Sequence, residues 1–272
     1  MGLFKYCGES GLSILKKLEL KVTPPNEFND PFEFNPVICK RNPQEYAKRE
    51  VKKFIQNRHF FETNKVHFPQ CKNFREFQVV ARANIGVLTS ALTSKSLNVD
   101  SKTDVLDMLS ESFGLICFSA DPLQPLMWAH YAASHKGLVI EFDSGDPLFK
   151  HESFLKVDYD PARAEYDITA KDTRAAVEAF AKRKSPDWAY EQEYRLILNL
   201  NLAQRKDIRG QYMYLVPIEP SLLKSVTIGL RATDATHEEV MSLAGSPPLE
   251  HLVIYQIETD ATQFKLHQRK IK

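Results

Sequence analysis

Glycine-rich loops are missing from this sequence. Only 10 of its 272 residues are glycine, and no cluster of them follows a predicted strand. Rossmann and P-loop nucleotide sites need such a loop, because its backbone N–H groups cradle the phosphates. The sequence therefore argues against these common nucleotide folds, and it leaves other kinds of nucleotide site open.

Paired cysteines and long apolar runs are also missing. The chain has four cysteines and no Cys-x-x-Cys pair, with the cysteines far apart at Cys7, Cys39, Cys71 and Cys117. Zinc is not expected, because His130 and His135 are five residues apart, a spacing that suits neither a helical pair nor a zinc finger. The first residues lack the apolar core of a signal peptide, and no apolar run approaches membrane-spanning length. We therefore expect a cytoplasmic protein with reduced cysteines, no bound metal and no membrane partner.

A strong charge of either sign is absent too. The 36 basic and 35 acidic residues give a formal net charge of +1. A global electrostatic attraction for nucleic acid or for an anionic membrane is therefore not indicated, although a local basic patch stays open. A hydrophobic content of 43% is that of an ordinary soluble globular protein.

The pattern of apolar and polar residues predicts an α+β fold: a mixed, largely antiparallel sheet with flanking helices. Asn42 and Pro43 predict the start of a long helix that runs to about Phe61. Further helices are predicted near 75–85 and 104–113, so we expect one domain over residues 1–272 with a helix-rich insertion at about 42–113. Strands are predicted at 3–6, 20–23, 115–119, 137–142, 154–159, 191–198, 226–230, 252–258 and 264–270.

The predicted strand at 191–198 carries an unusual set of charges. A strand repeats every two residues, so Glu191, Glu193 and Arg195 are expected on one face. Two carboxylates in this arrangement repel each other, and the arginine partly offsets the repulsion. Such a cluster is either an ion-pair ladder or a site that handles a developing positive charge.

Two other segments hold candidate site residues. In the turn 25–33, Asn29 and Asp30 are the side chains that could face a ligand, and the alternative is a rigid structural corner. In the second segment, Ser119 ends a predicted strand, and an aromatic stretch with Trp128, His130 and Tyr131 follows it. An aromatic stripe of this kind either packs in a core or stacks on a base or nicotinamide ring.

Taken together, these motifs resemble the bacterial family catalogued as domain of unknown function 2971. The resemblance covers residues 4 to about 228 and implies a role in defence or as a toxin, because some relatives are associated with abortive phage infection. An antitoxin or another defence partner is then expected. The motifs are Lys5-Tyr6, Asn29-Asp30-Pro31-Phe32-Glu33, Cys117-Phe118-Ser119, Trp128-Ala129-His130-Tyr131 with His135-Lys136-Gly137, and Trp188 through Glu191, Glu193 and Arg195.

A second resemblance, to ADP-ribosyltransferases of the Glu-x-Glu class, bears on mechanism. That class carries a basic residue on its first strand, a serine-containing strand end and a Glu-x-Glu before an apolar strand. Lys5, Ser119 and Glu191-Gln192-Glu193 occur here in the same order. The serine element departs from the class, with Cys-Phe-Ser in place of Ser-Thr-Ser, and Lys5 stands where the class uses arginine.

This second resemblance implies an NAD-consuming enzyme, a transferase to a protein or nucleic-acid acceptor or an NAD glycohydrolase. In that class the second glutamate bonds the nicotinamide ribose and stabilises the oxocarbenium-like transition state, while the first helps to place the acceptor. Glu193 would then be catalytic, Glu191 its helper, and Arg195 the group that steadies the pair. The expected NAD-binding residues are Lys5, Tyr6, Asn29, Asp30, Ser119, Trp128, His130 and Tyr131.

Two other functions stay open on the sequence. One is a metal-dependent nuclease with magnesium held by Asp30, Glu33, Glu191 and Glu193. The other is a non-enzymatic sensor or binding module whose acidic strand is a partner surface. The transferase hypothesis requires that Glu193, Ser119 and Tyr131 line a single cleft.

Overall fold

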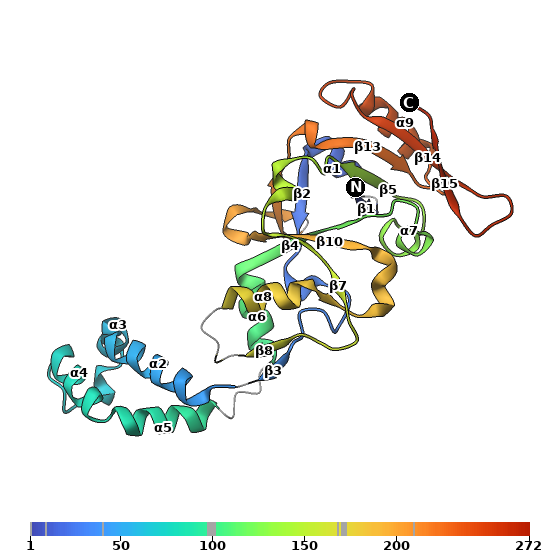
Figure 1. The fold of residues 1–272 in the computed structure, drawn as a ribbon. Coiled ribbons are helices and arrows are strands. Elements are labelled where there is room, and N and C mark those ends of the chain that lie inside the picture. The colour runs from blue at the N-terminus through green and yellow to red at the C-terminus, as the bar shows by residue number, and fades with distance from the viewer. Residues whose placement is uncertain are drawn as a thin grey trace. The chain divides into compact units, whose positions relative to one another are not determined.

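A computed structural model gives the fold of the chain (Figure 1). It describes residues 2–8, 10–39, 41–96, 102–167, 169, 173–208 and 210–272, so residues 97–101 of the predicted insertion lie outside the described residues. The chain divides into two compact units: unit 1 comprises residues 1–35, 104–163 and 180–272, and unit 2 comprises 36–103 and 164–179. The expectation of a single domain with an insertion at about 42–113 stays a prediction.

Unit 1 is built on an eight-stranded sheet. Six of its seven neighbouring strand pairs are antiparallel, and β13 and β14 form the parallel pair. The predicted α+β class with a mixed, largely antiparallel sheet is therefore confirmed. In sheet order the strands are β15 (Leu266–Lys270), β14 (Val253–Thr259), β13 (Leu223–Ile228), β5 (Leu138–Phe142), β1 (Leu3–Cys7), β4 (Phe113–Ser119), β10 (Glu193–Asn199) and β6 (Phe154–Lys156).

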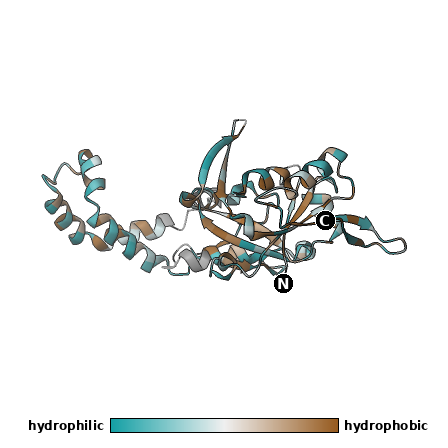
Figure 2. Cartoon of the chain, turned by 90° about the horizontal axis from the view of Figure 1, so that it is seen from above, coloured by the Kyte–Doolittle hydropathy of each residue, from teal (hydrophilic) through white to brown (hydrophobic). Residues whose placement is uncertain are grey.

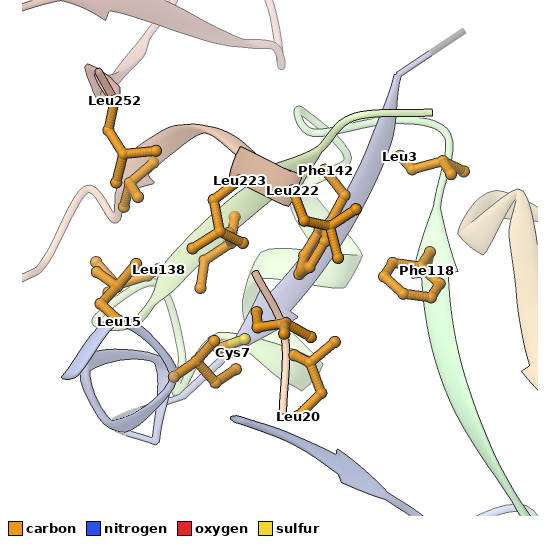
Figure 3. Packing of buried hydrophobic residues seen from close by; sticks show 14 of the residues in the cluster. Leu3, Cys7, Leu15, Leu20, Phe118, Leu138, Phe142, Leu222, Leu223 and Leu252 are labelled. Atoms are coloured by element: carbon orange, nitrogen blue, oxygen red, sulfur yellow. The ribbon is translucent and has the colours of Figure 1, made fainter. Parts of the chain in front are cut away.

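The central strands of this sheet are covered on both faces. Leu3 and Cys7 of β1 join one hydrophobic cluster, while Phe4 and Tyr6 pack against another, as the two-residue repeat of a strand requires. The first cluster includes Leu15 of α1 (Gly11–Lys17) (Figure 3). It also contains residues of α9 (Asp234–Ala244). The second contains residues of α7 (Pro125–Tyr131). Hydrophobic residues accordingly gather on the strands of the large sheet (Figure 2).

Close packing of the backbone requires a glycine at position 137, in the predicted motif His135-Lys136-Gly137. A Cβ on Gly137 would lie 2.0 Å from the carbonyl oxygen of Cys7, so a larger residue would push β1 and β5 apart. The preceding residues Ala133, Ser134 and His135 all have positive φ, at 47°, 55° and 70°. This tight turn ends α7 and leads the chain back into β5.

Smaller strand groups complete the fold. A three-stranded sheet has the order β11 (Gln204–Ile208), β12 (Gln211–Pro217) and β2 (Glu19–Val22). In unit 1 a short parallel pair joins β7 (Asp158–Tyr159) to β9 (Arg183–Lys184). In unit 2 a second parallel pair joins β3 (Val37–Cys39) to β8 (Glu165–Asp167).

Unit 2 is mainly helical and has its own phenylalanine-rich core. Its helices include α2 (Pro43–Gln56), α3 (Arg58–Thr63), α4 (Phe74–Ala83), α5 (Ile85–Ser96) and most of α8 (Thr173–Lys182). The predicted start at Asn42 and Pro43 is confirmed, but one continuous helix to Phe61 is wrong. Asn57 interrupts it, because its Oδ1 accepts a hydrogen bond from Phe60 N at 2.9 Å and so caps a new helix.

Candidate functional site

Three neighbouring strands bring the main sequence motifs together. In the antiparallel ladders, Ser119 at the end of β4 pairs with Phe4 of β1 on one side and with Glu193 of β10 on the other. Lys5 follows Phe4 directly, so all three motifs meet at one level of the sheet. Segments more than 180 positions apart in the sequence therefore contribute to one place.

A small pocket of about 130 Å³ lies at this place. Ser119, Tyr131 and Glu193 all line it, so the single-cleft requirement of the transferase hypothesis is met. Lys5, Tyr6, Asn29 and Glu191 line it as well, whereas Asp30, Trp128, His130 and Arg195 do not. The full lining is Phe4, Lys5, Tyr6, Phe28, Asn29, Glu33, Cys117, Phe118, Ser119, Met127, Tyr131, Lys184, Glu191 and Glu193.

Glu191 does not belong to the strand that was predicted to carry it. It ends the 3₁₀-helix η4 (Pro186–Glu191), Gln192 takes a left-handed conformation with φ 47° and ψ 50°, and β10 begins only at Glu193. Ser185 caps the start of this turn and Pro186 stands in its first position. The last residue of the turn is Glu191, the residue at which the strand was predicted to begin. The shared strand face is therefore wrong for Glu191 and confirmed for Glu193 and Arg195.

Arg195 is fully buried and holds Glu193 with two hydrogen bonds. Its Nε donates to Oε1 at 2.8 Å and its Nη2 to Oε2 at 2.9 Å. Nη1 donates to the carbonyl of Ala181 at 2.9 Å, and Nη2 also donates to Glu33 Oε1. The guanidinium carbon lies 5.5 Å from the ring centres of both Phe28 and Phe34. Arg195 thus positions Glu193 without lining the pocket itself.

Lys184 of β9 joins the two candidate carboxylates. Its Nζ donates to Glu191 Oε2 at 2.5 Å and to Glu193 Oε2 at 3.0 Å, and it lies 3.7 Å from Glu33 Oε1. The ammonium also lies 5.0 Å from the ring centre of Trp188. Three carboxylates, of Glu33, Glu191 and Glu193, therefore share two buried cations, Lys184 and Arg195.

The surroundings shift the pKa values of the two paired glutamates in opposite directions. Burial alone would raise the pKa of Glu193, but Arg195 and Lys184 outweigh burial and hold that pKa well below its usual range. Burial raises the pKa of Glu191 to about 7; Lys184 opposes this increase and the charge of Glu193 adds to it. At neutral pH Glu193 is therefore ionised, while Glu191 can take up or release a proton.

Hydrogen bonds fix Glu191 at the edge of the pocket. Tyr131 Oη donates to Glu191 Oε1 at 2.7 Å, and Ser119 Oγ donates to the backbone carbonyl of Glu191 at 2.6 Å. Ser119 Oγ also accepts from Asp121 N at 3.1 Å, and Tyr6 Oη donates to the carbonyl of Asp121 at 2.7 Å. Ser119 and Tyr6 thus both line the pocket and tie together the loops around it.

Three sequence-predicted residues lie away from this pocket. Trp128 is fully buried in the core, and its Nε1 donates to the carbonyl of Pro122 at 2.8 Å, so the core alternative holds for it. His130 is exposed beside Trp188, with ring centres 6.5 Å apart. Asp30 is buried, accepts a hydrogen bond from Phe32 N at 2.8 Å, and lines a separate hollow with Trp188 and Tyr190.

Sequence reasoning missed several residues of the site. Lys184 gave no signal, because it lies in a two-residue strand seven positions before Glu191. The sequence predicts a role for Glu33 only as a metal ligand, although Glu33 belongs to the same motif as Asn29. Cys117 also lines the pocket, and burial followed by the charge of Glu193 raises the pKa of its thiol. Its place in the Cys-Phe-Ser motif was the available signal.

Within the described residues, no group of three or more His, Cys, Asp and Glu side chains is arranged to hold a metal ion. Lys184 and Arg195 instead bond the carboxylates of Glu191, Glu193 and Glu33.

Among the residues that the structure describes, no helix combines the length and apolar character needed to cross a membrane.

The fold and the site define an α+β protein whose large sheet carries a small pocket lined in part by a buried cluster of carboxylates and cations. The sequence model of the DUF2971 family, described as a protein of unknown function, matches residues 127–196. The predicted resemblance to this family is confirmed over that stretch, which contains most of α7, all of β5, Lys184 and the Glu191–Arg195 segment. The motifs around Lys5, Asn29 and Ser119 lie outside it. Neither a search of curated proteins nor one of solved structures found a match.

Proposed function

We propose that this protein consumes NAD, either as an ADP-ribosyltransferase acting on a macromolecule or as an NAD glycohydrolase. One observation carries the proposal. The first-strand lysine, the serine strand end and the second glutamate of Glu-x-Glu, namely Lys5, Ser119 and Glu193, lie on three adjacent strands and line one pocket.

The size and lining of the pocket support a flat, ring-sized ligand group. Phe4, Phe28, Phe118 and Met127 give it apolar walls, and the charged groups lie together beside them. Its volume of about 130 Å³ is well below the usual range for a whole cofactor. The nicotinamide ring therefore enters the pocket in this proposal, and the adenosine part stays outside.

The fixed charge of Glu193 supports catalysis at the ribose. In NAD cleavage the bond from ribose C1′ to the ring nitrogen breaks, and both electrons stay with the nitrogen, which loses its positive charge. Positive charge then develops on the ribose, and a preorganised carboxylate stabilises that transition state more than the ground state. Glu193 stays ionised and is held by Arg195, so it has the required charge before the reaction begins.

Glu191 supplies the proton transfer in this scheme. The attacking water or acceptor group forms the new bond to C1′ and must lose a proton. A carboxylate with a pKa near the working pH is suited to take it, and the pKa of Glu191 is about 7. Tyr131 and Lys184 orient the carboxylate by bonding one oxygen each.

The direct test is NAD consumption by purified protein with labelled NAD and a range of acceptors. Glu193→Gln should lower the rate about 100-fold or more, because a neutral amide cannot stabilise the ribose cation. Glu238→Gln, an exposed change on α9, is the matched control and should leave the rate unchanged. An absence of NAD loss and of label transfer in the wild-type protein would contradict the proposal and favour a binding module.

The biological setting is part of the same proposal. The motif resemblance supports a defence or toxin role with an antitoxin or other partner. Expression in bacterial cells should then lower cellular NAD and slow growth, and the Glu193→Gln chain should do neither. Equal growth inhibition by both chains would contradict a toxic role that depends on NAD.

A further inference from the structure

Glu33 brings a buried hydrogen-bond acceptor without a partner to the pocket. Its Oε1 accepts from Arg195 Nη2, but its Oε2 is buried and has no hydrogen-bond partner. Each carboxylate oxygen can accept more than one hydrogen bond, and leaving a buried one without any is costly. Because Glu33 lines the pocket, a ligand in the pocket can supply the missing donor.

Three donors of the pocket lining, on Lys184, Tyr131 and Ser119, already bond acceptors within the protein. Lys184 Nζ donates to Glu191 and Glu193, and Tyr131 Oη donates to Glu191. Ser119 Oγ donates to the backbone carbonyl of Glu191. Glu33 Oε2 is an acceptor without a partner, so a ligand group beside it should be a hydrogen-bond donor.

The apolar walls define the rest of that ligand. Phe28 and Phe4 line the same pocket as Glu33, which suits the faces and edges of a flat ring. A ring that carries a carboxamide offers an N–H donor at its edge. A ring that carries an ionised carboxylate offers no donor to Glu33 Oε2.

We propose that Glu33 determines the specificity of the pocket: its Oε2 accepts a hydrogen bond from the carboxamide N–H of a nicotinamide ring and excludes the corresponding acid. This inference rests on the proposed function, since it names how the ring of the NAD substrate is recognised. Glu33 positions and selects the ring and takes no part in bond breaking.

The test measures equilibrium binding of free nicotinamide and of free nicotinate to the full chain at neutral pH. Ligand-observed NMR titration gives the dissociation constant of each ring. The wild-type protein should bind nicotinamide at least about tenfold more tightly than nicotinate, a difference typical of one buried polar contact. In Glu33→Gln the preference should fall to about threefold or less, because the side-chain amide can offer an N–H to the acid. Glu238→Gln is the control and should keep the wild-type preference.

The wild-type measurement alone tests the role of Glu33, even if the Glu33→Gln protein folds poorly. Equal binding of the two rings, tighter binding of nicotinate, or no binding of either ring by the wild-type protein would overturn the role of Glu33. So would an unchanged preference in a Glu33→Gln protein with a normal unfolding midpoint. NAD consumption without ring preference would refute this inference alone. Ring preference with no NAD consumption would refute the proposed function and leave the recognition by Glu33 standing.

Discussion

Glu191 and Glu193 are two residues apart and have identical side chains. Their bonding partners nevertheless give the two carboxyl groups different pKa values. Glu193 bonds both cations of the buried cluster, and its pKa is held low. Glu191 bonds Lys184 and the neutral Tyr131, and burial raises its pKa to about 7. A pair with one fixed charge and one exchangeable proton is what an acid–base site requires.

The proton of Glu191 predicts a pH dependence of NAD consumption. If Glu191 accepts the proton of the attacking group, the rate should rise with pH through a midpoint of about 7, because only the ionised form is a base. Glu191→Gln should remove this rise and leave a low rate at every pH. Rate measurements from about pH 5.5 to 8.5 test this. A midpoint near 7 that persists in Glu191→Gln would assign the proton to another group.

The same shifts set the pH dependence of stability. The folded-state pKa of Glu191 exceeds its unfolded value of about 4.3. The stability that Glu191 contributes is therefore fully present below about pH 4.3 and is lost as pH rises through about 7. The folded-state pKa of Glu193 is depressed, so its contribution is present above about 4.3 and is lost as pH falls through the folded value. Glu191→Gln should therefore flatten the fall of the free energy of unfolding between about pH 5 and 7, measured by urea titration.

At the scale of elements, one left-handed residue joins η4 to β10. Gln192 has φ 47° and ψ 50°, and its carbonyl accepts a hydrogen bond from Ala120 N at 3.1 Å. Gln192→Val should lower the free energy of unfolding by about 1–2 kcal/mol, since a β-branched residue is strained there. Gln192→Gly should change it by no more than about 0.5 kcal/mol, because glycine accepts this conformation. Thermal unfolding checks both, and equal stability of the two variants would show that the turn relaxes.

Much of the fold followed from the sequence, and the site only in part. The strand ending at Ser119 and the run Leu196–Leu198 were readable because buried strands are continuous apolar runs. Glu191 was misplaced, because a 3₁₀ turn before a strand leaves the two-residue pattern intact in sequence. Lys184 could not be found, since its partners are set by tertiary contacts and not by spacing.

At the scale of the whole molecule, the pocket belongs entirely to unit 1. Its lining residues come from Phe4–Glu33, Cys117–Tyr131 and Lys184–Glu193, which are joined only after long loops have closed. Unit 2 has a separate core in which Phe77 lies 5.0 to 6.0 Å, between ring centres, from Phe54, Phe61, Phe68 and Phe74. The two cores should therefore respond separately to mutation.

Phe77→Ala tests that separation. Phe77 is 2% exposed, so its loss should destabilise unit 2 by about 3–5 kcal/mol through lost burial and the cavity left behind. Hydrogen exchange should quicken in α2 and α4 and stay slow in β1, β4 and β10, and binding of nicotinamide should persist. Phe264→Ala is the matched control, because the Phe264 side chain is fully exposed and its loss should change neither unit. Faster exchange in the three pocket strands of Phe77→Ala would mean that the units unfold as one, and the pocket would then depend on the phenylalanine core of unit 2.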